Sequence, residues 1–122
     1  MKDIKLNLNL IIKDEDIDCI MKEALDTGIW YWCERVSIAS VCKEWNDYQQ
    51  ISKNGILLLK TKNGIFFLDK EDFIKGIRKA IYDDYNLLNI VDGKLYIDTF
   101  YIDADIADRI VQYAVFDKII YG

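Results

Sequence analysis

The side chains that carry most enzyme chemistry are scarce in this sequence. It contains no histidine, so it can form neither a Ser-His nor a Cys-His nucleophile pair and has no imidazole base. It also lacks a phosphate-cradling Gly-x-x-x-x-Gly-Lys segment and a Gly-x-Gly-x-x-Gly turn. Carboxylates remain as candidate catalytic groups, but no pattern selects one pair among the 21 acidic residues. The sequence therefore favours binding over catalysis.

A run of aspartates, Asp98, Asp103, Asp105 and Asp108, could in principle hold a divalent cation, because hard cations prefer carboxylate ligands. However, Asp103 is better explained as the N-cap of a helix and Asp105 as a first-turn acid that stabilises the helix dipole. Without histidine or a Cys-x-x-Cys pair, the ordinary zinc arrangements are also excluded. We expect neither a metal nor a cofactor.

Arg109 is the strongest candidate for an anion ligand. It is one of three arginines and falls on a flank of the C-terminal helix, away from the apolar stripe. A guanidinium recognises phosphate with a rigid bidentate fork, even in an acidic protein. The alternative is a helix-surface ion pair with Asp105, four residues earlier, worth ~0.3–0.5 kcal/mol.

Residues able to read a nucleoside occur in the preceding segment. Asn89 can pair with an adenine edge, and Asp92 can accept a hydrogen bond from ribose hydroxyls or an exocyclic amine. Stacking faces are offered by Tyr82, Tyr85, Tyr96 and Tyr101. The alternative for each tyrosine is half-buried packing with a wet hydroxyl.

The tryptophans leave two interpretations open. Residues 29–38 are rich in β-formers and predict a strand or a helix-to-strand corner, with Trp30 and Trp32 on one face. These rings would form either an aromatic cluster in the core or at a subunit interface, or a wall on which a base stacks. Trp45 lies in an irregular polar segment, which suits an oligomer contact or a ligand rim.

The elements that must position these residues follow from periodicity. Alternation over residues 4–12 predicts a strand, and one-face apolar spacing predicts helices after Asp14, Asp69 and Asp103, the first ending at Gly28. Asn63-Gly64 and Asp92-Gly93 predict two tight hairpins. Residues 119–121 predict a final strand. The expected class is α+β, with a mainly antiparallel sheet covered on one side by about three helices, in the order β-α-β-ββ-α-ββ-α-β.

Length and charge restrict the setting. The 122 residues, 52% hydrophobic, predict a single globular domain spanning 1–122. A net charge of −5 disfavours duplex nucleic acid and anionic membranes as partners. Because we recognise no signal peptide and no apolar run of ~20 residues, we expect a cytoplasmic protein. Its three cysteines, an odd number, should be reduced and mostly buried.

Two blocks carry a resemblance to a known family. The stretch Trp30-Tyr31-Trp32-Cys33, together with residues 102–122 and above all the segment 107–116, resembles small phage and prophage proteins, in particular the first described family of Thoeris anti-defence proteins. Members of that family are sponges that bind glycocyclic ADP-ribose signals made by bacterial TIR-domain enzymes and keep them from their effector.

The resemblance implies a homodimer or higher homo-oligomer that binds its ligand near subunit boundaries without hydrolysing it. Arg109 fits the arginine position of the family site, while Tyr82 and Asp92 stand where the family has phenylalanine and asparagine. Asn89 competes with Asp92 for the polar position. Two rival hypotheses are an oligomeric protein–protein interaction module and a carboxylate- or metal-dependent phosphoesterase.

Overall fold

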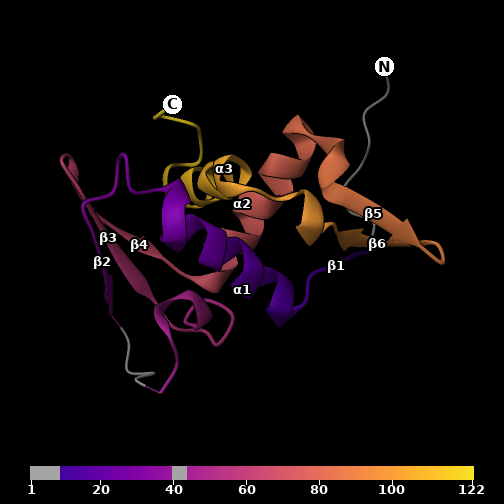
Figure 1. Ribbon diagram of the computed structural model, residues 1–122, viewed down its shortest axis with the longest axis horizontal. Helices are drawn as coiled ribbons and strands as arrows, with labels where there is room; N and C mark the ends of the chain where they lie inside the picture. The colour runs from indigo at the N-terminus through magenta and orange to yellow at the C-terminus, as the bar shows by residue number, and fades with distance from the viewer. Residues whose placement is uncertain (1–8, 40–43) are drawn as a thin grey trace.

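The computed structural model describes residues 9–39 and 44–122. It contains three α-helices and two three-stranded sheets among these residues. Figure 1 shows the helices in the middle of the molecule and the two sheets toward opposite ends of its long axis. The predicted α+β class and the order of elements through the last helix are confirmed. The single sheet with helices on one side is corrected to two sheets flanking the helices.

The first sheet has the strand order β1-β6-β5. Strand β1 (Leu10–Ile11) pairs in parallel with β6 (Lys94–Ile97), which forms an antiparallel hairpin with β5 (Leu88–Val91). The hairpin turn is Asp92-Gly93, as predicted, and both residues have positive φ angles, 52° and 75°. These angles belong to the tight turn whose twist matches that of the flanking strands. Most of the strand predicted over residues 4–12 lies outside the described residues.

The second sheet has the order β2-β3-β4 and is antiparallel throughout. Its strands are β2 (Arg35–Ile38), β3 (Leu57–Thr61) and β4 (Gly64–Leu68). The predicted hairpin is confirmed, with Leu57 opposite Leu68 and Leu59 opposite Phe66. The opposite face is not covered, since Ile65 and Phe67 are exposed. Only the face that carries Leu57 and Leu59 packs into the core.

The three helices are α1 (Asp14–Glu23), α2 (Lys70–Asp83) and α3 (Ala104–Phe116). The predicted N-caps of the last two are confirmed: the Asp69 carboxylate accepts a hydrogen bond from the Asp72 amide at 2.8 Å, and Asp103 accepts one from the Ile106 amide at 2.9 Å. Each cap satisfies an amide that has no partner inside the helix. Strands and caps together fix where α3 begins, and therefore where Arg109 lies.

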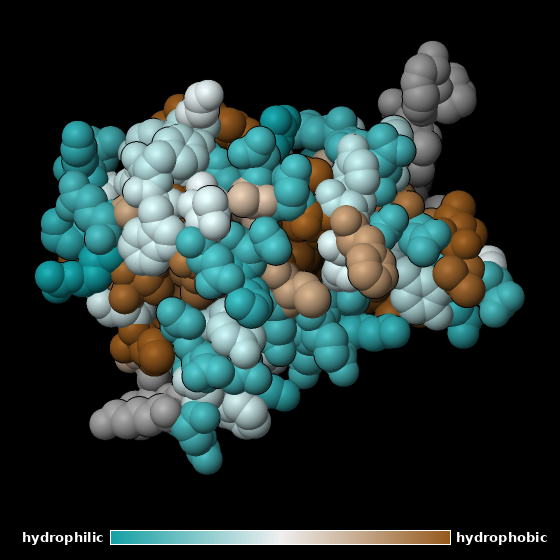
Figure 2. Space-filling model, in the orientation of Figure 1, coloured by the Kyte–Doolittle hydropathy of each residue, from teal (hydrophilic) through white to brown (hydrophobic). Residues whose placement is uncertain are grey.

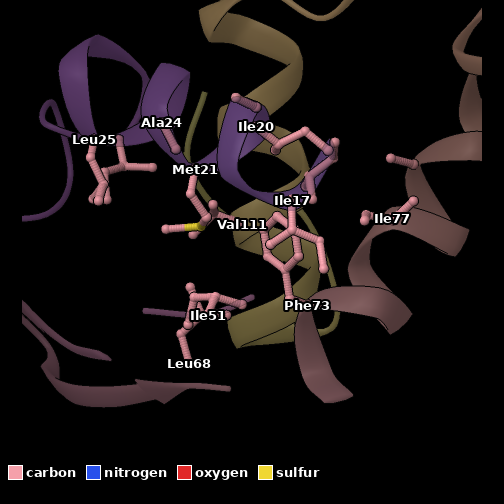
Figure 3. Close-up of a cluster of buried hydrophobic side chains, with 14 of the residues drawn as sticks. Ile17, Ile20, Met21, Ala24, Leu25, Ile51, Leu68, Phe73, Ile77 and Val111 are labelled. Carbon is pink, nitrogen blue, oxygen red and sulfur yellow. The ribbon is translucent and has the colours of Figure 1, made fainter. Parts of the chain in front are cut away.

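One hydrophobic cluster joins the helices to both sheets. Figure 3 shows that side chains of α1 such as Ile17 and Met21 lie near Phe73 of α2 and Val111 of α3. All four are at most 1% exposed. Burial of such apolar side chains contributes about 1.5–3 kcal/mol each, the main favourable term in folding. Among the cysteines, Cys33 is buried as expected, Cys19 is exposed, and Cys42 lies outside the described residues.

Gly28 ends the first helical segment, but not as the expected C-terminal glycine. Helix α1 continues into a π-helical turn, Ala24–Gly28, and the φ angle of Gly28 is not among the positive ones. A Cβ on Gly28 would lie 2.7 Å from the carbonyl oxygen of Ala104. Glycine is required here by the close approach of the N-terminus of α3, rather than by backbone conformation.

A second glycine permits close packing of α2 on α3. A Cβ on Gly76 would lie 2.5 Å from the Ile110 carbonyl oxygen and 2.9 Å from the Ala114 amide nitrogen. Glycine-to-alanine changes in a helix normally stabilise it by about 0.5–1 kcal/mol. We predict that Gly76→Ala instead destabilises the protein by about 2 kcal/mol, because the helices must separate.

Chemical denaturation of Gly76→Ala measures this effect. The exposed neighbour provides a matched control, since Lys75→Ala should change the unfolding free energy by less than about 0.5 kcal/mol. A Gly76→Ala protein as stable as the wild type would show that the two helices are not in tight contact at this position.

Candidate functional site

Arg109 is exposed on α3, and its guanidinium pairs with α2 rather than with its own helix. Its Nη2 atom lies 3.8 Å from Oδ2 of Asp83, and the Arg109 side chain is 54% exposed. Within the described part of the chain Arg109 forms its ion pair with Asp83 and none with Asp105, so the predicted i,i+4 pair is wrong. Because an exposed pair at this distance contributes only about 0–1 kcal/mol, little energy is needed to turn the guanidinium toward a ligand.

Arg109 borders two cavities. The first, which we call the acidic cavity, has a volume of about 260 Å³ and is lined by Asp83, Asp84, Asp103 and Asp105 as well as by Arg109. Four carboxylates beside one guanidinium make this cavity unfavourable for phosphate, since like charges repel most strongly where water is partly excluded. Tyr113 donates a hydrogen bond to Asp83, which raises the pKa of the tyrosine.

The second, which we call the tail cavity, has a volume of about 400 Å³. Arg109 lines it together with Tyr31, Asp105, Asp108, Ile119 and Tyr121. It combines a guanidinium with two aromatic side chains, and of its two aspartate side chains, Asp105 and Asp108, the second is occupied by hydrogen bonds. The tail cavity therefore offers anion binding and ring stacking together.

A buried polar network forms the floor of this region. Asp108 is 6% exposed. Its carboxylate accepts hydrogen bonds from the Tyr31 hydroxyl and the Trp32 indole N–H, both at 2.6 Å, and from the Gln112 side chain at 3.0 Å. A buried carboxylate requires such donors to offset its lost hydration. Loss of water around the Tyr31 hydroxyl where it meets Asp108, followed by the hydrogen bond itself, raises the pKa of Tyr31 to about 12, although much of the ring stays exposed.

Gln112 extends the network to the end of the chain. Its Oε1 atom accepts hydrogen bonds from the backbone amides of Ile120 and Tyr121, both at 2.9 Å, and its amide nitrogen lies 3.2 Å from the Tyr121 carbonyl oxygen. The Tyr121 ring stacks on Trp32 with a centroid distance of 5.3 Å. Residues 117–122 form no strand, contrary to prediction, because a side chain rather than a neighbouring strand satisfies their amides.

In the tryptophan segment the predicted helix-to-strand corner is confirmed, and the continuous strand is wrong. Residues 29–32 form turns, and β2 begins only at Arg35. Trp30 and Trp32 do not share a strand face: Trp32 is buried at 6% exposure, whereas Trp30 is 43% exposed and its indole N–H donates to the Leu25 carbonyl at 2.5 Å. Tertiary hydrogen bonds override the β-propensity of these aromatic residues. Trp45 is partly exposed, with Lys53 5.0 Å from its ring centroid.

The structure brings only part of the predicted site together. Tyr101 does not line the acidic cavity but contacts one of its lining residues: its hydroxyl donates to Asp84 at 2.8 Å, a bond that raises the pKa of the tyrosine. Tyr82 is exposed on α2, Asn89 lies on β5 opposite Tyr96, and Asp92 lies in the hairpin turn. None of these three residues lines the cavities described above.

Sequence reasoning missed the Asp108–Gln112 pair as a functional element. A signal for it was present, because Asp108 and Gln112 are four residues apart and lie beside the buried positions Ala107 and Val111. Two polar residues within the inward stripe of an amphipathic helix indicate a buried network. Its partners Tyr31 and Trp32 are 77 and 76 residues away from Asp108, a pairing that no periodicity reveals.

Within residues 9–39 and 44–122, no group of three or more histidine, cysteine, aspartate or glutamate side chains could hold a metal ion. No helix of that part of the chain is long and apolar enough to cross a membrane. Comparison with protein-family models, with curated proteins and with solved structures finds no match to this chain.

Proposed function

We propose that this protein is a phage anti-defence sponge, which binds cyclic ADP-ribose-type signals, glycocyclic ADP-ribose in particular, in the host cytoplasm. It would hold the signal without cleaving it and so keep it from the Thoeris effector. The observation that carries the proposal is the position of Arg109, a half-exposed guanidinium at a cavity walled by Tyr31 and Tyr121. The resemblance of residues 30–33 and 102–122 to the sponge family supplies the ligand class.

In the proposed complex Arg109 binds the diphosphate from the tail cavity, since the acidic cavity would repel it. Rings at this cavity stack on the adenine. Tyr82, Asn89 and Asp92 contribute from a neighbouring subunit of a homo-oligomer, because on their own chain they line neither cavity at Arg109. Tyr101, whose hydroxyl is bonded to Asp84, would contact a ribose.

The fate of the bound ligand tests the proposal. Purified protein is incubated with a glycocyclic ADP-ribose isomer, separated from free ligand by filtration and heat-denatured, and the released nucleotide is analysed by chromatography. We expect the intact cyclic compound, in stoichiometric amount. Release of linear ADP-ribose, or magnesium-dependent turnover, would contradict a sponge and favour a phosphoesterase.

A second candidate function, an oligomeric protein–protein interaction module, is favoured by exposed apolar side chains. Phe100 is fully exposed, and Ile90 on β5 is 69% exposed. Figure 2 shows hydrophobic side chains reaching the surface at the end of the molecule formed by β5 and β6. Exposed patches of this kind mark contacts with other proteins. No shift in thermal stability across a panel of nucleotide signals would favour this function over the sponge.

A further inference from the structure

A third cavity, which we call the aromatic cavity, lies apart from Arg109. It has a volume of about 530 Å³ and lies between the tryptophan turns, the β3–β4 hairpin and Tyr121. Its lining includes Trp30, Tyr31, Glu34, Lys62 and Asn63. Small-molecule sites typically occupy about 300–1,000 Å³ and combine apolar walls with a few polar groups. We propose that the aromatic cavity is a second ligand site, for a planar heteroaromatic ring that carries a phosphate.

The aromatic walls are held in fixed orientations while their faces remain open. The Trp30 indole is anchored through its hydrogen bond to Leu25, and the Tyr31 ring through its hydrogen bond to Asp108. Trp30 and Tyr31 are 43% and 59% exposed, and neither ring stacks on another ring of the described residues. A planar ring that stacks on such a preorganised wall gains about 1–3 kcal/mol.

The polar rim favours an anionic group. Glu34 is already paired with Lys60 at 3.1 Å, which offsets its charge. Lys62, two residues further along the hairpin, is exposed and forms no ion pair with any described residue. Its ammonium group is thus available as a point charge for a phosphate. Asn63 donates a hydrogen bond to the Tyr121 hydroxyl at 3.2 Å, and its carbonyl oxygen can accept one from a ring amino group.

The site is separate from the one proposed for the cyclic signal. Tyr31 and Tyr121 stand between the aromatic cavity and the tail cavity and line both. Of these two cavities, Arg109 lines only the tail cavity, and Lys62 lines only the aromatic cavity. Trp30, whose indole is exposed, lines the aromatic cavity and does not line the tail cavity. Ligand binding at the second site therefore depends on Lys62 and is reported by tryptophan fluorescence, whether or not the sponge function is correct.

Fluorescence titration with AMP, adenosine and inorganic phosphate tests the second site. AMP should quench the tryptophan emission with saturation, adenosine should bind about 5–10-fold more weakly because it lacks the charge that Lys62 neutralises, and phosphate alone should leave the emission unchanged. Lys62→Ala should weaken AMP binding by about the same factor and leave adenosine binding unaltered, whereas the control Lys75→Ala should leave both unaltered.

Two more variants locate the site. In Trp30→Phe, calorimetry should detect AMP binding within about 3-fold of the wild type, because a ring is retained for stacking, while most of the fluorescence change disappears. Arg109→Gln should leave the AMP titration unchanged. Equal affinities for AMP and adenosine, an AMP affinity indifferent to Lys62→Ala, or an AMP response lost in Arg109→Gln would each overturn the proposal.

Discussion

Arg109→Ala is expected to weaken retention of a glycocyclic ADP-ribose signal by at least about 100-fold, which corresponds to about 2.7 kcal/mol. A bidentate guanidinium–phosphate contact has this strength where solvent is partly excluded. The fold should be unaffected, because the ion pair between Arg109 and Asp83 is exposed at 54% and 39% of the two side chains and contributes little. Isothermal titration calorimetry and a thermal melt of the same sample measure both quantities.

Two further variants test whether the planar fork of the Arg109 guanidinium is needed in addition to its charge, and whether the effect is specific to Arg109. Arg109→Lys keeps the charge but loses the planar fork, so we expect an intermediate loss of about 10-fold. Arg35→Ala removes an exposed guanidinium from β2 and serves as the matched control, with unchanged affinity. An Arg109→Ala protein that retains the signal as tightly as the wild type would refute the site.

Gln112→Ala is expected to lower the free energy of unfolding by about 3 kcal/mol. Gln112 is fully buried and holds Asp108 on one side and the amides of Ile120 and Tyr121 on the other. Its removal leaves several buried polar groups without partners, at about 1–3 kcal/mol for each that water cannot reach. Urea denaturation measures the loss.

The volume of the side chain is controlled by Gln112→Met, which fills the space but makes none of these hydrogen bonds. If the network stabilises the tail, Gln112→Met should be nearly as unstable as Gln112→Ala, and amide exchange at Ile120 and Tyr121 should accelerate in both variants. Wild-type stability in Gln112→Met would show that Gln112 acts through packing alone.

Local signals in the sequence were sufficient for much of the fold. The turns at Asn63-Gly64 and Asp92-Gly93 and the N-caps Asp69 and Asp103 were correctly predicted, because each depends on the chemistry of a few adjacent residues. For residues 29–38 the helix-to-strand corner was correct and the continuous strand was not, and the final strand predicted over residues 119–121 was wrong. The first segment is held by the hydrogen bonds of Tyr31 and Trp32 to Asp108, far along the chain. In the last segment the side chain of Gln112 satisfies the amides of Ile120 and Tyr121, and local propensity contains no information about either arrangement.

The candidate site also combines features that local sequence reveals with features that depend on tertiary packing. Arg109 could be selected from the sequence by elimination, and its helix was placed correctly. Its actual partner Asp83 lies on another helix, and the cavity wall formed by Tyr31 and Tyr121 joins segments that are far apart in the sequence. Such combinations depend on tertiary packing, so composition and spacing could not reveal them.

Because the residues of the polar network are far apart in the sequence, the network forms late during synthesis. Trp32 and Tyr31 leave the ribosome long before Asp108, 76 and 77 residues later, and the Tyr121 ring that stacks on Trp32 follows later still. Contacts of such high sequence separation are entropically costly to close and form slowly. During synthesis the indole of Trp32 must therefore remain without its final partners until the last helix is complete, and the walls of both proposed ligand cavities are among the last parts of the molecule to form.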